Sequence, residues 1–168
     1  MSDLGTYERH GDHIDVRFER HYPRPPEKVW RALTDPERLA DWMGVSHVEP
    51  HVGGRFETML EGIRPMRGQV LAWDPPTLLE LHWSNGHAPD STVRYELTAE
   101  GNGTRLIFTH RHMPHATSAL MLPGWHVFLA RLERVLEDRE PPDWVARWRE
   151  MQAVYVEHYG LGALQLDP

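Results

Sequence analysis

Histidine is the residue type in this sequence with the most obvious capacity for chemistry, since the chain contains 12 histidines and no cysteine. His110 and His112 stand two apart in an alternating segment, so on a strand they would share one face. His115 follows in the next loop, and His82 belongs to another candidate strand. A zinc site needs three or four ligands that converge tetrahedrally, and the histidines follow no fixed ligand motif. We therefore predict no metal site and no cofactor.

His110 is also the best candidate for acid–base catalysis, with Tyr95 as its donor partner. A catalytic imidazole lies in a pocket whose surroundings shift its pKa. The competing interpretation is a histidine of the core or pocket edge whose hydrogen bonds are all satisfied, and we favour it. The sequence contains no Gly-x-Ser-x-Gly, His-Glu-x-x-His, phosphate-loop or dinucleotide-binding motif. We expect a binding protein without obligatory catalysis and keep catalysis at His110 as an alternative.

Arg20 is a charged residue on an otherwise apolar strand face. The segment His13–Tyr22 alternates between apolar and polar residues, which predicts a half-buried strand. A buried guanidinium needs a partner. That partner is either the carboxylate of a bound ligand or a carboxylate of the protein itself, and both remain open from the sequence.

The composition is that of an ordinary globular domain. Of the 168 residues, 40% are hydrophobic and 26% are charged, unlike the composition of a disordered chain. The formal net charge is −7, and no block of lysine or arginine is present. We therefore predict no nucleic-acid partner, because such a chain repels a phosphate backbone overall.

The sequence predicts a cytoplasmic protein that does not insert into membranes. Its first residues lack the apolar core of a secretion signal. The longest segment without formal charge, Ala116–Ala130, is interrupted by Pro123 and Gly124, whereas a spanning helix needs about 20 apolar residues. The absence of cysteine agrees with a reducing compartment.

Alternating segments separated by glycine, proline and asparagine predict an antiparallel meander in the middle of the chain. After the first strand, the predicted strands are Val45–Glu49, Arg55–Leu60, Met66–Trp73, Leu78–Trp83, Thr92–Thr98 and Thr104–His112. Glycines within or beside these strands permit bends and bulges. They are Gly53, Gly54, Gly62 and Gly68.

Helical periodicity predicts two short helices after the first strand and two helices after the meander. Asp35 is the expected cap of the second short helix, which ends at Gly44. The long third helix carries an apolar stripe at Trp125, Leu129, Leu132 and Leu136. The last helix spans Asp143–Tyr159 and ends at Gly160. Its apolar side consists of Trp144, Trp148, Met151 and Tyr155.

A series of short motifs follows in order along residues 13–137. They are Arg20-His21-Tyr22-Pro23-Arg24-Pro25, Val29-Trp30, Thr34-Asp35-Pro36-Glu37-Arg38-Leu39, Gly53-Gly54-Arg55-Phe56, Gly68-Gln69-Val70, Asp74-Pro75-Pro76, Leu78–Trp83, Thr104-Arg105-Leu106, Thr109-His110 and Gly124-Trp125. Together they resemble the START-like (Bet v 1-like, SRPBCC) superfamily, and most closely its branch of heat-shock protein 90 ATPase activator homologues.

The resemblance implies an α+β helix-grip fold, in which a curved antiparallel β-sheet wraps around the long C-terminal helix and encloses a cavity. We predict three parts of the chain, of which the last lies outside the core that the resemblance covers. Residues 1–12 would be a flexible N-terminus, and 13–138 the START-like domain. Residues 139–168 would be a helical extension, packed on the domain or at a homodimer contact.

We predict that this cavity holds a small hydrophobic or aromatic molecule, acidic or lipid-like in the finer interpretation, with Arg20 as anchor. The predicted ligand-binding residues are Phe18, Arg20, Trp42, Phe56, Met66, Trp83, Tyr95, Phe108, His110, Trp125, His126 and Leu129. Each aromatic among them has plain core packing as its competing role. The resemblance offers two other functions, a pocket enzyme of the cyclase, aromatase or hydrolase type using His110, and a protein-interaction module of the stress response related to chaperone activators.

Overall fold

Apart from an additional first strand, the helices and strands follow one another in the order that the sequence predicts. The computed structural model describes residues 3–60, 65–86 and 90–162. Its elements are β1 (Thr6–His10), β2 (His13–Tyr22), α1 (Pro26–Thr34), α2 (Pro36–Trp42), β3 (Ser46–Val48), β4 (Arg55–Thr58), β5 (Met66–Asp74), β6 (Leu78–Trp83), β7 (Ser91–Glu100), β8 (Gly103–Pro114), the 3₁₀ turn η1 (His115–Thr117), α3 (Ser118–Leu136) and α4 (Trp144–Tyr159).

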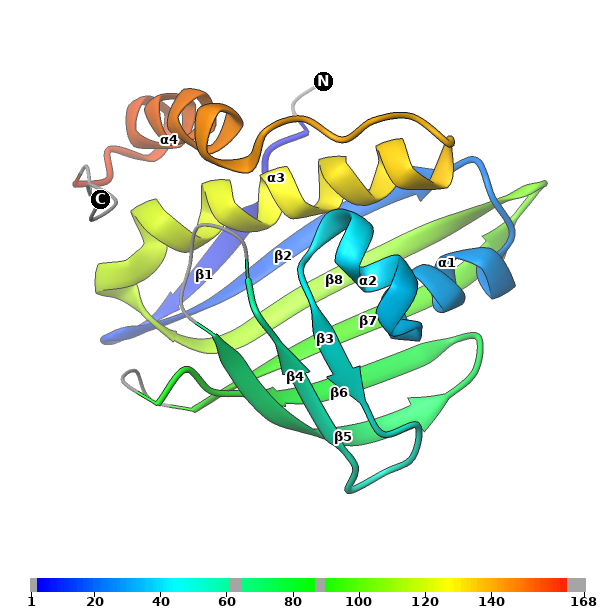
Figure 1. The fold of residues 1–168 in the computed structure, drawn as a ribbon. Coiled ribbons are helices and arrows are strands. Elements are labelled where there is room, and N and C mark those ends of the chain that lie inside the picture. The colour runs from blue at the N-terminus through cyan, green and yellow to red at the C-terminus, as the bar shows by residue number, and fades with distance from the viewer. Residues whose placement is uncertain (1–2, 61–64, 87–89, 163–168) are drawn as a thin grey trace.

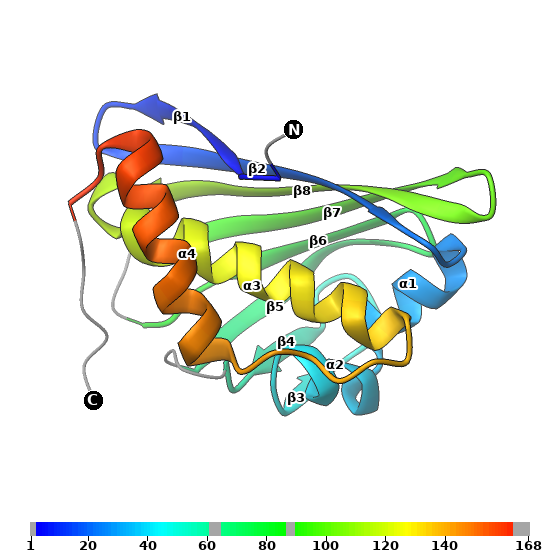
Figure 2. The same ribbon diagram turned by 90° about the horizontal axis from the view of Figure 1, so that it is seen from above.

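One antiparallel sheet of eight strands, in the order β1-β2-β8-β7-β6-β5-β4-β3, forms the body of the molecule. The sheet curves around α3, and α1 and α2 lie beside the second half of that helix (Figure 1). Seen from above, α4 crosses the outer side of the first half of α3 and reaches toward the β1 end of the sheet (Figure 2). The predicted helix-grip fold is thereby confirmed.

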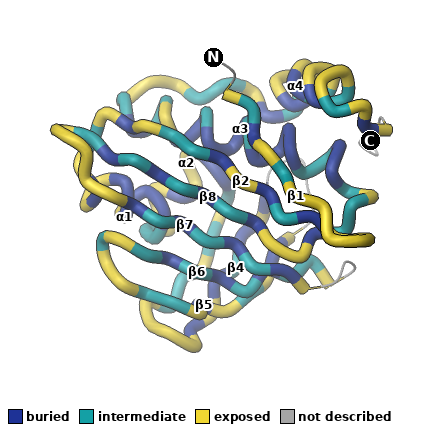
Figure 3. Tube along the Cα trace, turned by 180° about the vertical axis from the view of Figure 1, so that it is seen from behind, coloured by how far each residue is buried: buried dark blue, intermediate teal, exposed yellow. Residues whose placement is uncertain are grey.

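Alternation along the strands separates a buried concave face from a more exposed convex face, as the burial colours show (Figure 3). On β2, the predicted apolar positions are buried and Arg20 between them is half-buried. The convex face carries ion pairs across neighbouring strands, such as Arg94 with Glu80 and Arg105 with Glu19, each at 2.7 Å. Such exposed pairs contribute little stability, so the apolar concave face supplies most of the driving force for folding.

The helix ends form where the sequence places them. The carboxylate of Asp35 accepts a hydrogen bond of 3.0 Å from the backbone N–H of Glu37. Asp143 caps α4 in the same way, at 2.8 Å from the N–H of Ala146. Gly160 ends α4 with a φ of 66°, in the left-handed region that glycine tolerates.

The first helical turns of α3 precede Trp125, the first residue of the apolar stripe from which the sequence predicts the long helix. The helix begins at Ser118 and contains Pro123. Proline cannot donate to the carbonyl four residues earlier, which is that of Ala119. The side-chain amide of Gln152 on α4 donates to this carbonyl oxygen at 3.2 Å. A helix distant in sequence therefore supplies the donor that proline lacks.

The N-terminal segment also differs from the expectation of a flexible stretch over residues 1–12. Thr6–His10 forms β1, and it pairs with β2 through a two-residue turn between His10 and His13. Gly11 in that turn has a φ of 66°, as a tight hairpin requires. The segment is mostly polar because β1 is an edge strand with little burial, so hydrophobic alternation does not reveal it.

The strand boundaries shift by a few residues from those predicted, and one shift changes a face assignment. On β8, Arg111 and His112 together oppose Asp15 of β2, because the register shifts there. His112 adopts a φ of 63° and is exposed, whereas His110 is buried. The prediction that these two histidines share a face is therefore wrong, since a β-bulge changes the parity of a strand. The predicted bend at Gly62 lies outside the described residues.

The C-terminal extension packs against its own domain. The indole N–H of Trp148 donates to the carbonyl oxygen of Leu120 on α3 at 3.0 Å. Arg131 of α3 donates to the carbonyl oxygen of Pro142, in the connection that precedes α4. None of the helices formed by the described residues is both long and apolar enough to cross a membrane.

Candidate functional site

His110 lies in a buried hydrogen-bond network that joins two strands and a helix. Its Nε2 is 2.7 Å from Oγ of Ser91 on β7, and its Nδ1 accepts a hydrogen bond of 2.9 Å from the indole Nε1 of Trp125 on α3. Because an indole N–H only donates, Nδ1 carries the lone pair and Nε2 carries the proton. Ser91 Oγ therefore accepts from His110 and donates its own proton to the carbonyl oxygen of Trp83, 3.3 Å away.

This arrangement keeps His110 neutral. Burial lowers the pKa of His110 to about 3, because the imidazolium form would lose its hydration. A general base needs a free lone pair, but Nδ1 is bonded to Trp125 and Nε2 bears the proton. Ser91 accepts a hydrogen bond from the imidazole instead of donating one to it, the reverse of a serine–histidine nucleophile. The arrangement corresponds to the satisfied core histidine favoured from the sequence.

Five aromatic residues adjoin this network, and we call them the aromatic cluster: Phe18, Trp83, Tyr95, Phe108 and Trp125. The ring centroid of Trp125 is 4.3 Å from that of Phe108 and 5.2 Å from that of Trp83. Phe108 lies 5.2 Å from Tyr95 and 6.1 Å from Phe18. These separations are those of aromatic rings in contact. The residues predicted to line a ligand cavity thus pack against one another.

Two tyrosine hydroxyls on the concave face differ in their hydrogen bonding. The hydroxyl of Tyr22 on β2 donates to the carbonyl oxygen of Leu129 on α3 at 3.1 Å. The hydroxyl of Tyr95 on β7 forms no hydrogen bond with any residue that the structure describes, although this side chain is only 2% exposed. Burial raises the pKa of both phenols, so both keep their protons. Among the described residues, the fully enclosed side-chain polar atoms without a partner are Thr109 Oγ1 and Trp144 Nε1, and the Tyr95 hydroxyl is not one of them. The Tyr95 hydroxyl therefore keeps a small accessible surface and costs less than the about 1–3 kcal/mol of a fully enclosed hydroxyl without a partner.

Residues 23–137 match the model of the family described as activator of Hsp90 ATPase homolog 1-like protein. The chain belongs to this family. The match covers strands β3 to β8, both short helices and the long helix, and it confirms the resemblance found in the sequence. A comparison with curated protein sequences gives no match.

Solved structures extend the comparison beyond the family's common segment. The crystal structure of CalU16 from Micromonospora echinospora is 24% identical, with a TM-score of 0.73, and the alignment covers 94% of this chain and 96% of that one. DynU16, from the dynemicin biosynthetic locus, is 29% identical with a TM-score of 0.69, over 76% of this chain and 48% of that one. PFC0360w, an Hsp90 activator from Plasmodium falciparum, is 24% identical with a TM-score of 0.53, over 60% and 74%.

Among the predicted site residues of this family member, Arg20 lies at the margin of the aromatic cluster and has partners of its own. Its guanidinium donates to the carbonyl oxygens of Glu19 at 2.9 Å and Asp3 at 2.8 Å. The guanidinium carbon Cζ of Arg20 is 5.2 Å from the ring centroid of Phe18. Main-chain carbonyls therefore take the place of the carboxylate expected from the sequence, and the role of Arg20 as a ligand anchor stays a prediction.

His126 belongs to a second polar group, between α3, α4 and the residues before β1. Its Nδ1 is 3.0 Å from the hydroxyl of Tyr155 on α4, which accepts a hydrogen bond of 2.7 Å from the N–H of Gly5. Burial, followed by the nearby charge of Arg20, lowers the pKa of His126 to about 4. Its neutral Nδ1 accepts a hydrogen bond from the Tyr155 hydroxyl, because the oxygen of that hydroxyl already accepts a hydrogen bond from the N–H of Gly5. His126 thus contributes to the attachment of α4.

The remaining predicted residues are buried but are set apart from the network around His110. Trp42 donates to the carbonyl oxygen of Ala32 at 2.9 Å, and its own carbonyl accepts from Arg131. No ring contact within the described residues joins Trp42 or Phe56 to the aromatic cluster. Leu129 holds the Tyr22 hydroxyl through its main chain. Met66 lines a hollow of about 290 Å³ beside β3 and β4.

Ser91 is a member of the His110 network that the sequence reasoning missed. The predicted strand began at Thr92, one residue too late. Ser91, Val93 and Tyr95 alternate as inward positions of β7, so extending the alternation by one residue would have placed Ser91 inward.

In the described parts of the chain, no three His, Asp or Glu side chains gather to hold a metal ion.

Proposed function

We propose that the chain binds a small, mostly apolar molecule between the concave face of the sheet and α3, with the hydroxyl of Tyr95 as its polar anchor. The observation that carries the proposal is the Tyr95 hydroxyl, which forms no hydrogen bond with the described residues, belongs to a side chain only 2% exposed, and is not fully enclosed. A ligand oxygen would accept its proton, and the rings of Phe108 and Trp125 would contact the apolar part of the ligand. An aromatic or lipid-like ligand with one carbonyl or carboxylate fits this chemistry.

Magnitudes explain why one anchor matters. Burying about 300 Å² of apolar ligand surface contributes about 7 kcal/mol, and association costs at least about 4 kcal/mol. The difference corresponds to millimolar affinity. A hydrogen bond from the Tyr95 hydroxyl to the ligand adds its own stabilisation, and it also ends the cost of leaving that hydroxyl without a partner.

The ligand must also separate rings that touch in the unliganded chain. Trp125 has the closest ring neighbour, Phe108 at 4.3 Å, and moving its indole breaks the hydrogen bond to His110. We therefore expect binding to change the fluorescence of Trp125. DynU16, a structural neighbour of this chain, is encoded in the dynemicin biosynthetic locus, and that setting supports a small organic ligand for this chain also.

The two other functions receive less support. Catalysis at His110 would require a lone pair that its two hydrogen bonds leave unavailable. Chaperone activation is the stated activity of PFC0360w, but likeness at that identity extends to the fold alone.

The test is a titration with Nile red, a neutral apolar dye with a carbonyl acceptor, against two matched variants. Tyr95→Phe should raise the Kd of the dye about five-fold and leave the free energy of unfolding unchanged or higher. Tyr22→Phe should lower the free energy of unfolding by about 1 kcal/mol and leave the Kd near that of the unsubstituted chain. Native mass spectrometry of freshly purified protein then identifies any ligand that co-purifies.

Two results would overturn the proposal. One is dye binding that is absent, or identical in the unsubstituted chain and in Tyr95→Phe. The other is an equal loss of stability in both variants, which would mean that Tyr95 has a protein partner as Tyr22 does.

A further inference from the structure

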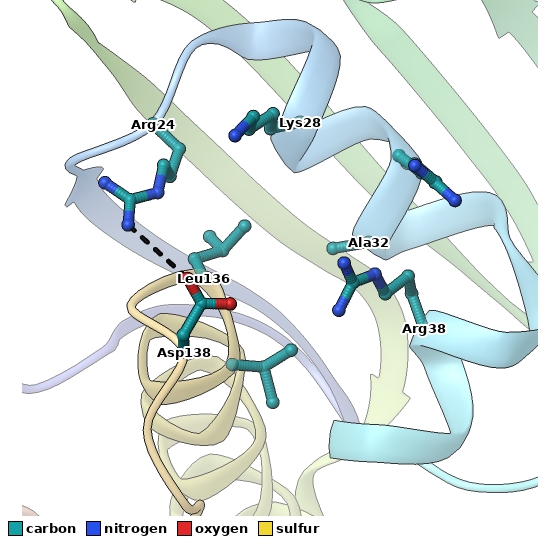
Figure 4. Close-up of a pocket in the computed structure, with 8 residues that line it drawn as sticks. Arg24, Lys28, Ala32, Arg38, Leu136 and Asp138 are labelled. Atoms are coloured by element: carbon teal, nitrogen blue, oxygen red, sulfur yellow. Dashed lines mark ion pairs between the residues drawn. The ribbon is translucent and has the colours of Figure 1, made fainter.

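A small hollow on the opposite side of the molecule from β1 collects cationic side chains. It has a volume of about 160 Å³ and lies between α1, α2 and the end of α3. Four cations line it: Arg24, Lys28, Arg31 and Arg38. In Figure 4, Arg24, Lys28 and Arg38 come from the α1–α2 side, and Leu136 and Asp138 face them from the end of α3.

The charge of this hollow is opposite to that of the chain. Four cations and one carboxylate, Asp138, line it, which gives a local net charge of +3, whereas the whole chain carries −7. At physiological ionic strength, charges separated by more than about 8 Å are largely screened. An anion in the hollow therefore experiences these five groups and the carboxylates of Asp35 and Asp41, which are the ion-pair partners of Arg31 and Arg38.

The cations are only weakly paired within the protein. Arg24 is 3.9 Å from Asp138, and Arg38 is 3.9 Å from Asp41. A strong charge-assisted hydrogen bond is about 2.7–2.9 Å long. Arg31 is closer to its partner, Asp35, at 3.3 Å. The ammonium group of Lys28 has no ion-pair partner in the part of the chain that the structure describes.

Stabilisation of the end of α3 does not account for this gathering of charge. Cations often neutralise the free carbonyls at a helix C-terminus. Here three of the last four carbonyls of α3 have backbone partners: the N–H groups of Glu137, Asp138 and Arg139 donate to the carbonyl oxygens of residues 133–135 at 2.8–3.1 Å. No hydrogen bond joins the four cations to these carbonyls within the described residues.

We propose that this hollow binds a multiply charged oxyanion, specifically a phosphate or phosphate-monoester group. Guanidinium groups match phosphate oxygens in pairs, and an ammonium adds a compact charge. The hollow is smaller than the about 300–1,000 Å³ typical of sites that enclose a whole ligand. It fits a phosphate group, with Ala32, Val135 and Leu136 offering an apolar surface to the adjoining part of the molecule. This site is separate from the interior proposed above.

The experiment is a titration with inorganic pyrophosphate at constant ionic strength, followed by backbone amide chemical shifts. We expect saturable shifts at α1, α2 and the end of α3. Lys28→Gln and Arg38→Gln should each weaken binding about five-fold. Asp138→Asn should tighten it by a similar factor, because it removes the repelling carboxylate. Arg149→Gln, an exposed arginine of α4, removes the same charge elsewhere and should leave the affinity unchanged.

The gain expected for Asp138→Asn is the decisive part, because damage to the fold cannot tighten binding. The proposal is wrong if pyrophosphate produces no saturable shifts in this region. It is also wrong if Arg149→Gln weakens binding as much as Lys28→Gln, since that result reports only net charge. Nile red is neutral, so failure of the interior site and failure of this site are observed separately.

Discussion

The indole of Trp125 and the imidazole of His110 meet in a hydrogen bond of 2.9 Å that joins α3 to β8. The indole is the donor, so this bond determines which nitrogen of His110 carries the proton. It thereby also determines the direction of the hydrogen bond between His110 and Ser91. The helix thus sets the protonation pattern of a residue on the sheet.

Trp125→Phe keeps an aromatic ring but removes the donor, leaving Nδ1 of His110 buried and unsatisfied. We expect the free energy of unfolding to fall by about 1–3 kcal/mol beyond the loss of packing, measured by urea denaturation. In a His110→Phe background the same substitution should cost less, because the unsatisfied acceptor is absent. Strictly additive costs in this double-mutant cycle would show that the two side chains are not coupled.

The buried His110 and the half-buried His126 predict a loss of stability in acid. The folded-state pKa of His110 is about 3 and that of His126 about 4, against an ordinary value of 6.5. Between these values the unfolded chain binds protons that the folded chain does not, so stability rises with pH. We expect the free energy of unfolding to be highest above pH 6.5 and to fall toward pH 4, by up to about 1.4 kcal/mol per pH unit for each histidine.

Urea denaturation at several pH values between 7 and 4 measures this slope. His110→Gln keeps a donor and an acceptor but does not titrate, so its slope should be shallower by one proton. An unchanged slope in this variant would mean that His110 titrates normally in the folded chain.

Tyr155→Phe removes the hydroxyl that bonds both His126 and the N–H of Gly5. The buried N–H of Gly5 loses its acceptor, so we expect a loss of about 1–3 kcal/mol and faster hydrogen exchange at this amide. Val154→Ala, at a more exposed position of the same helix, serves as the control. Unchanged exchange at Gly5 in Tyr155→Phe would show that α4 does not hold the residues before β1.

Gly68 is close to the neighbouring strand, and a Cβ atom added there would be 1.8 Å from the carbonyl oxygen of His82. Gly68→Ala must therefore push β5 from β6, and we expect a loss of more than about 3 kcal/mol by urea denaturation. Gly101→Ala meets no atom within 4 Å but occupies a φ of 58°, and should cost about 1 kcal/mol. Equal costs would show that the sheet adjusts easily at Gly68.

Elements whose signal is local could be predicted from the sequence. The alternation of His13–Tyr22 and the caps at Asp35 and Asp143 depend on neighbouring residues. β1 was not predicted, because this edge strand buries few residues and its sequence does not alternate between apolar and polar residues. The first turns of α3 were not predicted, because the donor that compensates for Pro123 comes from Gln152 on α4. The local sequence pattern does not reveal a donor from a distant helix.

In the candidate site too, local pattern predicts some features and not others. The inward parity of Tyr95, Phe108 and His110 follows from alternation, and the structure brings these residues together. The hydrogen bonds that fix the state of His110 come from different elements, and spacing along the chain does not encode their partners. Spacing along the chain likewise does not reveal that the Tyr95 hydroxyl forms no hydrogen bond with the described residues.

Gly5 is held on every side, with its N–H bonded to Tyr155, its carbonyl bonded to Tyr159 and no space for a Cβ atom above the ring of Phe18. The two tyrosines lie 150 and 154 residues further along the chain. During synthesis on the ribosome, Gly5 emerges long before its two partners, because all the other strands and α3 lie between them in the sequence. The first strand can thus form before these hydrogen bonds exist, and the bonds can close only after the whole sheet and α3 have been synthesised.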